Sequence, residues 1–478
     1  MRPTLVVTLL CVVALAPVAG AEEPPVAHVR SGAEDRADLG VTVYSSGFGL
    51  VRETRVLPLG KGKTELEFAG VASTIQPETV QIHPLANASV RVLEQNYRYD
   101  LLSPEKLLEK YVGRNVKVLR WSELKGRDEE RDATVLSSGP PAILRVGDEI
   151  TWGYPGRISF PEIPKNLIAK PSLVWLLDSA AEKPKVEVSY LAQSLTWKAD
   201  YVLVVDAADA TGDLNGWVTL DNRSGAAFEN AKLQLVAGDV NRVTPQAIGR
   251  AMAKDRAYAA ESAPVQQFQE EGLFEYHLYT LDRPATLLDN EQKQLALLEA
   301  SGIKLHKKLV LRGESYWYRS SFGGQNLPQE KVHVSLEFEN KESEHLGLPL
   351  PKGIIRVYKR DSSGGRQFLG ENSIDHTPRD EKVRVAVGDA FDVVGERKQT
   401  DYKVVDRCRS ESAWQIDLRN HKDQKVDVDV IEPASGDWEI VTSSQKATKE
   451  DAHTFSFQVP VPANGSARVE YRVRVRWC

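Results

Sequence analysis

Apolar and polar residues alternate along the stretch from Leu195 to Val240, which reads LTWKADYVLVVD, a short polar gap, and then LNGWVTLDNRSGAAFENAKLQLVAGDV. In the first run every second residue is apolar, and a period of two places such residues on one face of a β-strand. We therefore expect Trp197 and Tyr201 to be buried and Asp200 to lie on the opposite face. The pattern predicts three strands in the middle of a large antiparallel sheet, over Leu195–Val205, Gly216–Asn222 and Ala231–Ala237.

Strand-like runs of this kind occur through most of the chain, so the predicted fold class is all-β, with multidomain antiparallel β-sandwiches around a large central sheet. Changes in the pattern divide the chain into six parts. These are a signal peptide (1–21), a flexible leader (22–38), an N-terminal β region (39–96), a small SH3-like or OB-like barrel insert (97–165), a central β-sandwich (166–380) and a C-terminal immunoglobulin-like sandwich (381–478). Residues 244–269, rich in Ala, Gln and charge, predict a mobile loop or a marginal helix within the central part.

The segment SPEKLLEKYVGRN predicts one short helix in the barrel-like insert. Ser103 can cap its N-terminus, Pro104 suits its first turn, and Gly113 stands where a helix stop is expected. Several short strand-like runs follow, and a helix with tight strands is typical of a small barrel. We interpret the charged run GRDEERD (126–132) between them as a solvated loop tip.

Two other segments are informative. The first fits two kinds of element, and the second shows a clear pattern of strands. TLLDNEQKQLALLEASG fits either a helix or a strand, and its strand-rich neighbours favour a strand that follows a turn at residues 288–290. About seven strand-like runs in residues 381–478 give the count and spacing of an immunoglobulin-like sandwich. In the last of them, inward positions alternate with outward Arg468, Glu470, Arg472, Arg474 and Arg476.

Composition and charge narrow the class of protein. The chain has 478 residues, of which 41% are hydrophobic and 27% charged, as in globular proteins. Its formal net charge of −6 is spread along the sequence and argues against nucleic acid as a partner. The apolar run Leu5–Ala16 after Met1-Arg2, followed by small residues, predicts a signal peptide cleaved after Ala21. We expect an exported protein, periplasmic or secreted, with no transmembrane segment after cleavage.

Cleavage would leave two cysteines, Cys408 and Cys478. They are either two free thiols or a disulfide, which an export compartment permits. In immunoglobulin-like sandwiches an early strand often pairs in parallel with the last one. If TDYKVVD pairs in this way with VEYRVRVRW, the two cysteines meet at one end of the domain. The bond would close a loop of about 70 residues and contribute on the order of 4 kcal/mol.

Several motifs resemble a family of exported bacterial proteins known as domain of unknown function 4139. They are VTVYSSGFGLVRETRVLPL with the following QPET, LTWKADYVLVVD, the strands that end in KLQLVAGDV, and VHVSLEFENKESEHLGLPLPKGIIRVYK. Together they extend over most of residues 40–478. The resemblance implies a β-sandwich architecture in the cell envelope, and it carries no agreed activity, cofactor or catalytic residue. The chain resembles mucoidy-inhibitor-A-like proteins more distantly. Many of those have a long coiled coil where this chain has the barrel-like insert.

The sequence contains no recognisable catalytic or metal-binding motif. The nine histidines are scattered, without HExxH or HxH, and no GxSxG, GxxxxGK[ST] or GxGxxG motif occurs in a suitable context. We therefore assign no catalytic, cofactor-binding or metal-binding residue and expect no cofactor. Glu342, Glu344 and His345 form the densest cluster of acids and histidine, and we interpret that cluster as a polar hairpin end.

Aromatic and arginine side chains give weak indications of a binding surface. In SYWYRSSF, read as a strand, Trp317 would face opposite to Tyr316 and Tyr318, so one face is exposed unless these rings fill the core. Tyr97 and Tyr99 in QNYRYD make a similar pair. Exposed aromatics bind sugars or proteins.

The outward arginines of the last strand, Arg472, Arg474 and Arg476, allow two interpretations. They form an anion-binding surface, for example for lipid headgroups or acidic glycan, or they pair across strands. Asp427 and Asp429 alternate outward in QKVDVDVIE and are the partners we expect for such pairing, which we favour.

Three functional hypotheses follow. The first is a non-catalytic envelope protein that binds an envelope protein or glycan, or acts as a scaffold. The second is a hydrolase of envelope polysaccharide or peptide with a site built from loops. The third is an assembly partner that presents an open edge strand. A cleft with two carboxylates or a His–acid pair of shifted pKa would favour the enzyme.

Overall fold

The computed structural model describes residues 26–85, 89–164, 167–168, 170–238, 240–241, 267–322, 327 and 330–478. Strands dominate these residues, which contain a single α-helix and four 3-10 helices, so the all-β prediction is confirmed. The predicted signal peptide, 1–21, lies outside the described residues, as do residues 244–266 of the predicted loop. Among the described helices, none has the length and apolar character needed to cross a membrane.

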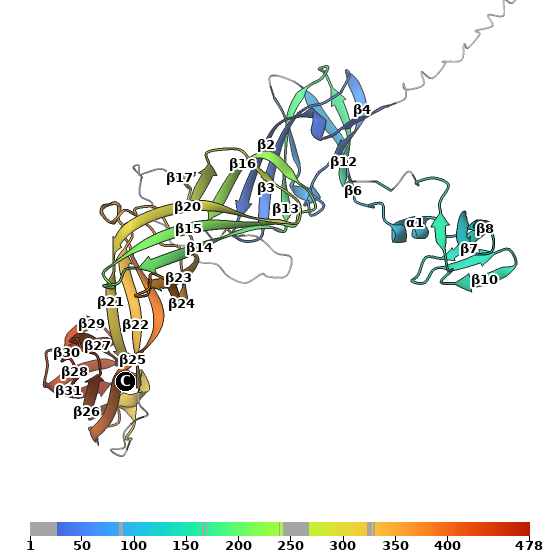
Figure 1. Ribbon diagram of the computed structural model, residues 1–478. Coiled ribbons are helices and arrows are strands. Elements are labelled where there is room, and N and C mark those ends of the chain that lie inside the picture. The colour runs from blue at the N-terminus through green and yellow to red at the C-terminus, as the bar shows by residue number, and fades with distance from the viewer. Residues whose placement is uncertain are drawn as a thin grey trace, which may run out of the picture. The chain divides into compact units, whose positions relative to one another are not determined.

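The chain, which Figure 1 colours by residue number, divides into two compact units. The first unit comprises the described residues of Met1–Arg36, Arg55–Val71 and His83–Glu187, and the second those of Ala37–Thr54, Ala72–Ile82 and Val188–Cys478. Five sheets account for the strands. Two of these sheets lie in the first unit.

A four-stranded sheet of the first unit has the order β1-β4-β12-β6. Its strands are β1 (Ala27–Ser31), β4 (Gly62–Ala69), β12 (Ser172–Ser179) and β6 (Val90–Arg98). Part of the segment predicted as a leader is therefore β1, which pairs in parallel with β4. Arg55 is fully buried, lies 3.6 Å above the ring centre of Phe68, and donates to the backbone oxygens of Ser31 and Ala69. These bonds satisfy its buried charge and hold the end of β1.

The second sheet of this unit, with the order β10-β9-β8-β7-β11, lies in the predicted insert. Its elements are α1 (Pro104–Lys110), β7 (Asn115–Ser122), β8 (Arg127–Ser137), β9 (Ile143–Val146), β10 (Glu149–Trp152) and β11 (Arg157–Ser159). The predicted helix is confirmed, and the Ser103 side chain accepts a bond from the Lys106 backbone N–H at 3.2 Å.

The loop interpretation of the charged run 126–132 is wrong, because most of it belongs to β8. Exposed cross-strand ion pairs accommodate these charges within the sheet. Lys117 on β7 pairs with Glu130, and Arg157 on β11 pairs with Asp128. A charged run can therefore form a strand when other strands of the same sheet supply the opposite charges.

An eight-stranded sheet has the order β17-β18-β16-β2-β3-β13-β5, with β19 paired to β16 beside that path. Its strands are β17 (Phe268–Leu273), β18 (Tyr276–Leu281), β16 (Phe228–Ala237), β2 (Arg36–Tyr44), β3 (Phe48–Val56), β13 (Lys185–Gln193), β5 (Gln81–Pro84) and β19 (Ala285–Leu287). The pair β2–β16 is parallel, so residues some 190 positions apart in sequence become neighbours.

A five-stranded sheet of the second unit has the order β20-β15-β14-β23-β24. Its strands are β20 (Glu291–Lys304), β15 (Thr211–Asn222), β14 (Leu195–Val205), β23 (Gly353–Arg360) and β24 (Arg366–Ile374). The ambiguous segment is the strand β20, as predicted. The burial of Trp197 and Tyr201 is confirmed. Gly353 is required beside Tyr201, because a Cβ there would lie 2.9 Å from its ring and 2.3 Å from a backbone oxygen.

The prediction that Leu195–Val240 forms three strands of one antiparallel sheet is wrong. Strands β14 and β15 pair antiparallel, but β14 pairs in parallel with β23, and β16 belongs to the eight-stranded sheet. The turn after β15 moves the chain from one sheet to the other. Hydrophobic alternation identifies each strand but carries no information on which sheet it joins.

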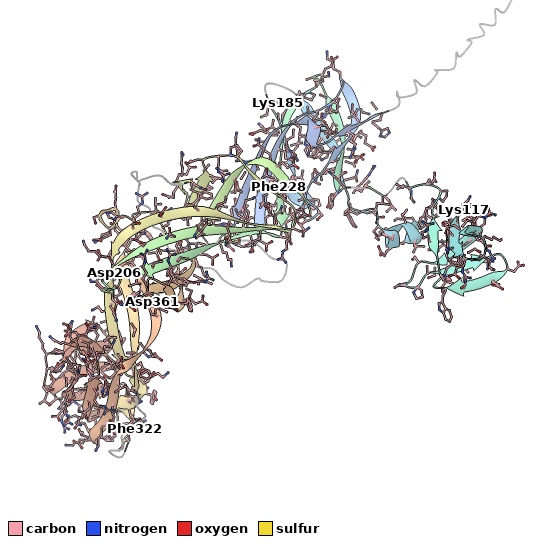
Figure 2. All side chains as sticks on the ribbon, in the orientation of Figure 1. Lys117, Lys185, Asp206, Phe228, Phe322 and Asp361 are labelled. Carbon is pink, nitrogen blue, oxygen red and sulfur yellow. A yellow bond between two sulfur atoms is a disulfide. The ribbon has the colours of Figure 1, made fainter. Side chains whose placement is uncertain are left out.

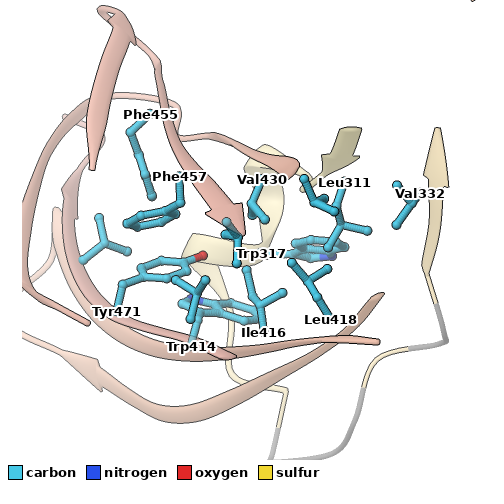
Figure 3. Close-up of a cluster of buried hydrophobic side chains, with 14 of the residues drawn as sticks. Leu311, Trp317, Val332, Trp414, Ile416, Leu418, Val430, Phe455, Phe457 and Tyr471 are labelled. Atoms are coloured by element: carbon cyan, nitrogen blue, oxygen red, sulfur yellow. The ribbon is translucent and has the colours of Figure 1, made fainter. Parts of the chain in front are cut away.

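The largest sheet has nine strands in the order β28-β31-β26-β25-β22-β21-β27-β30-β29. They are β28 (Asp437–Ser443), β31 (Gly465–Arg476), β26 (Arg409–Asn420), β25 (Lys382–Val404), β22 (Glu330–Glu339), β21 (His306–Arg312), β27 (Val426–Pro433), β30 (Thr454–Val461) and β29 (Thr448–Asp451). The sheet thus includes β21 and β22, which precede the predicted boundary at residue 381. Figure 3 shows part of its aromatic core, in which Trp414, Phe455 and Tyr471 are buried.

Candidate functional site

The aromatic segment SYWYRSSF is not a strand, which corrects the predicted alternation of its rings. Ser315–Arg319 form a 3-10 helix (η3), in which Trp317 and Tyr318 are buried and Tyr316 is 58% exposed. Successive side chains of a helix with three residues per turn point about 120° apart, so two neighbours can both face the core. Trp317 lies against Trp414 in the core of the nine-stranded sheet (Figure 3). Only Tyr316 remains available as a surface residue.

Trp317 and Tyr318 belong to a buried polar cluster formed with Arg397, Glu330, Glu432 and Tyr471. The Arg397 guanidinium donates to Glu330 from Nε at 3.0 Å and also to Glu432, and it lies 4.6 Å from the ring centre of Trp317. Tyr318 Oη donates to Glu432 and lies 3.0 Å from Tyr471 Oη. Burial raises the pKa of the Tyr318 and Tyr471 hydroxyls well above the usual value. These groups are enclosed and mutually satisfied, which is the arrangement of a structural cluster rather than a ligand site.

The arginines of β31 pair across strands, but with partners other than those predicted. Arg472 and Arg474 both bond to Glu411 on β26, with Arg474 Nη2 at 2.9 Å and Arg472 Nη1 at 3.2 Å. The expected partners Asp427 and Asp429 lie on β27, which does not neighbour β31. Arg476 Nε instead donates to the backbone oxygen of Cys478 at 2.9 Å.

Cys408 and Cys478 form a disulfide, with their Cα atoms 5.3 Å apart. The strand pairing that brings them together differs from the predicted one. β26 lies between β25 and β31 and pairs antiparallel with β31. The pairing starts with Arg409 opposite Arg476, so Cys408, which precedes Arg409, comes close to Cys478, which follows Arg476. The predicted parallel pairing of TDYKVVD with the last strand is therefore wrong.

The second unit contains an open groove of about 840 Å³, lined by the polar face of the nine-stranded sheet and by Glu371 and Asn372 of β24. Five strands of the nine-stranded sheet lie side by side there, in the order β25-β22-β21-β27-β30, and every second residue of β21, β27 and β30 lines the groove. We call it the acidic groove, and its charged lining residues are Lys308, Arg312, His333, Glu337, Glu371, Arg384, Asp389, Asp429, Glu450 and Asp451.

Ion pairs cross between neighbouring strands in the acidic groove. Lys308 Nζ lies 3.1 Å from Asp429 on β27, and Arg384 Nε lies 2.6 Å from Glu337 on β22. His333 Nδ1 lies 2.7 Å from an oxygen of Asp389, whose other oxygen is 3.0 Å from Lys331. The hydrogen bonds from the Lys331 and His333 side chains lower the pKa of Asp389.

Carboxylates are in excess in the acidic groove. Six of its described lining residues are Asp or Glu, against three Lys or Arg, which gives a net charge of −3 when His333 is neutral. The backbone N–H of His453 also lowers the pKa of Asp451, so this group is ionised at neutral pH. A negative, open and hydrogen-bonding surface attracts cationic groups.

The side chains near His333 bear on the question of catalysis in the groove. Ser335 lies two residues from His333 on β22, but no hydrogen bond joins these side chains within the described part of the chain. No three His, Cys, Asp or Glu side chains in the described ranges are placed to hold a metal ion. The acid–His cluster noted in the sequence, Glu342, Glu344 and His345, is a polar turn, in which Glu344 pairs with Lys304 and His345 Nδ1 lies 2.5 Å from the Ser301 oxygen.

The lining residues of the acidic groove come from segments between residues 308 and 458, and no spacing motif connects them. The sequence did contain part of the signal, because His333, Ser335 and Glu337 alternate with the apolar residues of β22. Asp427 and Asp429 show the same alternation on β27. The sequence did not show the strand order, which places these polar positions next to one another.

The sequence model of the family described as domain of unknown function (DUF4139) matches residues 186–478. No curated protein matches the chain. The matched range contains the acidic groove, the buried polar cluster and the disulfide.

Proposed function

The chain belongs to the DUF4139 family, and from that premise and the acidic groove we propose that it is an exported cell-envelope protein that acts by binding rather than by catalysis. Its ligand is an extended segment of a partner protein that carries Lys or Arg side chains. The observation that carries this proposal is the excess of three carboxylates over permanent cations in the groove.

The state of the groove carboxylates supports binding. Asp389 and Asp451 have lowered pKa values and are ionised acceptors at neutral pH. A general acid or base works best when its pKa lies near the working pH, which is not the case for these groups. Ionised carboxylates at an open surface are, in contrast, ready to accept ammonium and guanidinium donors.

The disulfide supports the exported location. Cys408 and Cys478 are bonded, and disulfides persist in oxidising compartments but are rare in the cytosol. The signal peptide predicted from the sequence, with cleavage after Ala21, also indicates export. Fractionation of cells that produce the full chain tests this part, and the expected result is a shortened protein in the periplasm or medium.

Calorimetric titration of the mature chain with a short lysine-rich peptide tests the ligand class. We expect saturable binding that weakens as salt is raised, because added ions screen exposed charges. Glu371→Gln and Glu450→Gln should each weaken binding by up to about fivefold. Glu470→Gln changes an exposed carboxylate of the nine-stranded sheet outside the groove and is the matched control. Equal binding of a glutamate-rich peptide would contradict the proposal.

One observation favours a second function, the hydrolysis of envelope polysaccharide or peptide. His333 and Asp389 are within hydrogen-bond distance at 2.7 Å, and a carboxylate on Nδ1 is the arrangement that orients a catalytic histidine. Incubation of the chain with peptidoglycan fragments and mass analysis of the products tests this. Products that disappear in His333→Gln would establish hydrolysis, while unchanged fragments favour the binding function.

A further inference from the structure

A second concave site lies in the first unit, outside the residues that the family model matches. It is an open hollow of about 730 Å³, which we call the tyrosine hollow. Its lining comes from β1, β4, the end of β6 and the first turn of α1. The lining residues used below are Glu65, Tyr97, Arg98, Tyr99, Asp100 and Lys106.

Two stacked tyrosines form one wall of the tyrosine hollow. The ring centres of Tyr97 and Tyr99 are 5.6 Å apart, and their planes differ by 30°. Tyr99 is 71% exposed, whereas Tyr97 is partly buried at the edge of the four-stranded sheet, and burial raises the pKa of its hydroxyl. Tyr97 therefore supports the ring of Tyr99, which leaves a broad aromatic surface open to solvent.

The polar groups around these rings are balanced in charge. Arg98 lies 3.4 Å from Glu65, and Lys106 lies 3.6 Å from Asp100, which also binds Lys110 at 2.6 Å. Two carboxylates and two permanent cations line the hollow, so it has no net charge while His28 is neutral. This distinguishes it from the acidic groove. The hollow therefore presents both hydrogen-bond donors and hydrogen-bond acceptors to an uncharged ligand.

We propose that the tyrosine hollow binds a neutral saccharide, with a sugar ring stacked on Tyr99 and its hydroxyls bonded to the charged side chains around it. A sugar ring has an apolar C–H face that packs on an aromatic ring, and hydroxyls that need donors and acceptors in the same small region. Arg98 and Lys106 supply donors, and Glu65 and Asp100 supply acceptors. An anionic ligand gains little here because each cation already faces a carboxylate.

The test is titration of the mature chain with maltotetraose, cellotetraose and N-acetylated chitotetraose, followed by calorimetry and by saturation-transfer NMR. We expect saturable binding of at least one of them. Tyr99→Ala should weaken it about tenfold, as for the truncation of an aromatic hot spot, whereas Tyr99→Phe keeps the stacking surface and should stay within about threefold. Tyr316→Ala removes an exposed tyrosine of the second unit and is the matched control, expected to have no effect.

Four results would overturn this inference. They are the absence of saturable binding of all three sugars, equal binding by Tyr99→Ala and the parent chain, an equal loss in Tyr316→Ala, and tighter, salt-sensitive binding of an acidic oligosaccharide. The acidic groove is tested separately, since Glu371→Gln should leave sugar binding unchanged, and failure of peptide binding would not alter the result for sugars.

Discussion

The nine-stranded sheet carries charged side chains on both sides, and the two sets differ in their exposure to water. On the core side, the side chains of Arg397 and Glu432 are fully buried, and each of their buried nitrogen and oxygen atoms has a hydrogen-bond partner. On the groove side, Arg384 is 70% exposed although it also pairs with a carboxylate, Glu337. Each set contains an arginine–glutamate pair, and only the groove pair has a member that is open to water. The surroundings of each pair, rather than its residue types, decide what it does.

The difference has a simple electrostatic origin. Away from water, a charge interacts strongly with its partner, and the loss of that partner leaves an unsatisfied ion. At an exposed site water replaces the partner at little cost, so the pair contributes little to stability and can exchange for a ligand. The buried polar cluster therefore stabilises the fold, and the acidic groove is free to bind.

The largest effect should come from breaking the buried pair. Glu432→Gln leaves the fully buried Arg397 guanidinium with Glu330 alone, and we expect a loss of about 3 to 5 kcal/mol in the free energy of unfolding. Urea denaturation measures it. The double variant Arg397→Met/Glu432→Gln removes both charges and should lose less than the single variant. A single-variant loss as small as that of an exposed pair would show that the cluster is not stabilising.

Removal of the disulfide should have the next largest effect. Cys408 and Cys478 are 70 residues apart, so their bond restricts the unfolded chain over a long loop. We expect Cys408→Ser/Cys478→Ser to lose about 2 to 4 kcal/mol of unfolding free energy. The parent chain, unfolded in the presence of a reductant, is the control and should match the variant. Identical stability of oxidised and reduced parent chains would refute this expectation.

A variant of the groove should change binding more than stability. Arg312→Gln removes an exposed cation that lines the groove, and we expect its free energy of unfolding to change by less than about 1 kcal/mol. The acidic groove then gains one unit of net negative charge, so the lysine-rich peptide should bind more tightly at low salt. Weaker peptide binding by this variant would contradict the assignment of a cationic ligand.

The smallest effect concerns an exposed carboxylate that accepts several hydrogen bonds within one turn. Asp361, labelled in Figure 2, lies in the turn between β23 and β24, and bonds from Ser363, Gln367 and the Gly365 N–H lower its pKa to about 2. Because the pKa is lower in the folded state, the stabilisation is present above the unfolded pKa of 3.8 and is lost as pH falls towards 2.

Asp361→Asn should therefore remove part of the acid dependence of stability. Denaturation of the variant and the parent chain at neutral pH and at acid pH measures this. We expect their difference in unfolding free energy to shrink as pH falls. A difference that is constant over this range would show that Asp361 is protonated equally in both states.

Much of the fold could be predicted because a strand with one buried face shows its period in the sequence. The bounds of β14, Leu195–Val205, agree with the predicted strand, and the cap at Ser103 correctly placed the start of α1. The errors occurred where the local pattern has two solutions. Trp317 and Tyr318 suit a strand, yet they form a short helical turn because both rings gain by entering the core.

The candidate site was harder to predict, because it depends on strand order. The alternation around His333 and Asp429 showed polar faces on two strands, but these strands are separated by about 90 residues. Only the parallel pairing of β21 with β27 places them on one surface. The arginines of β31 show the same limit, since their partner Glu411 was determined by the neighbouring strand β26.

The sequence by itself determined the strand-rich class, the two faces of most strands and the short helix, because these depend on local period and capping. The tertiary structure decided how Leu195–Val240 is divided between two sheets, which charges are enclosed, and which lie open in the acidic groove and the tyrosine hollow. These properties depend on pairing between distant strands, which a local pattern does not encode. Burial then decides whether a pair of charged residues contributes to stability or is open to a ligand.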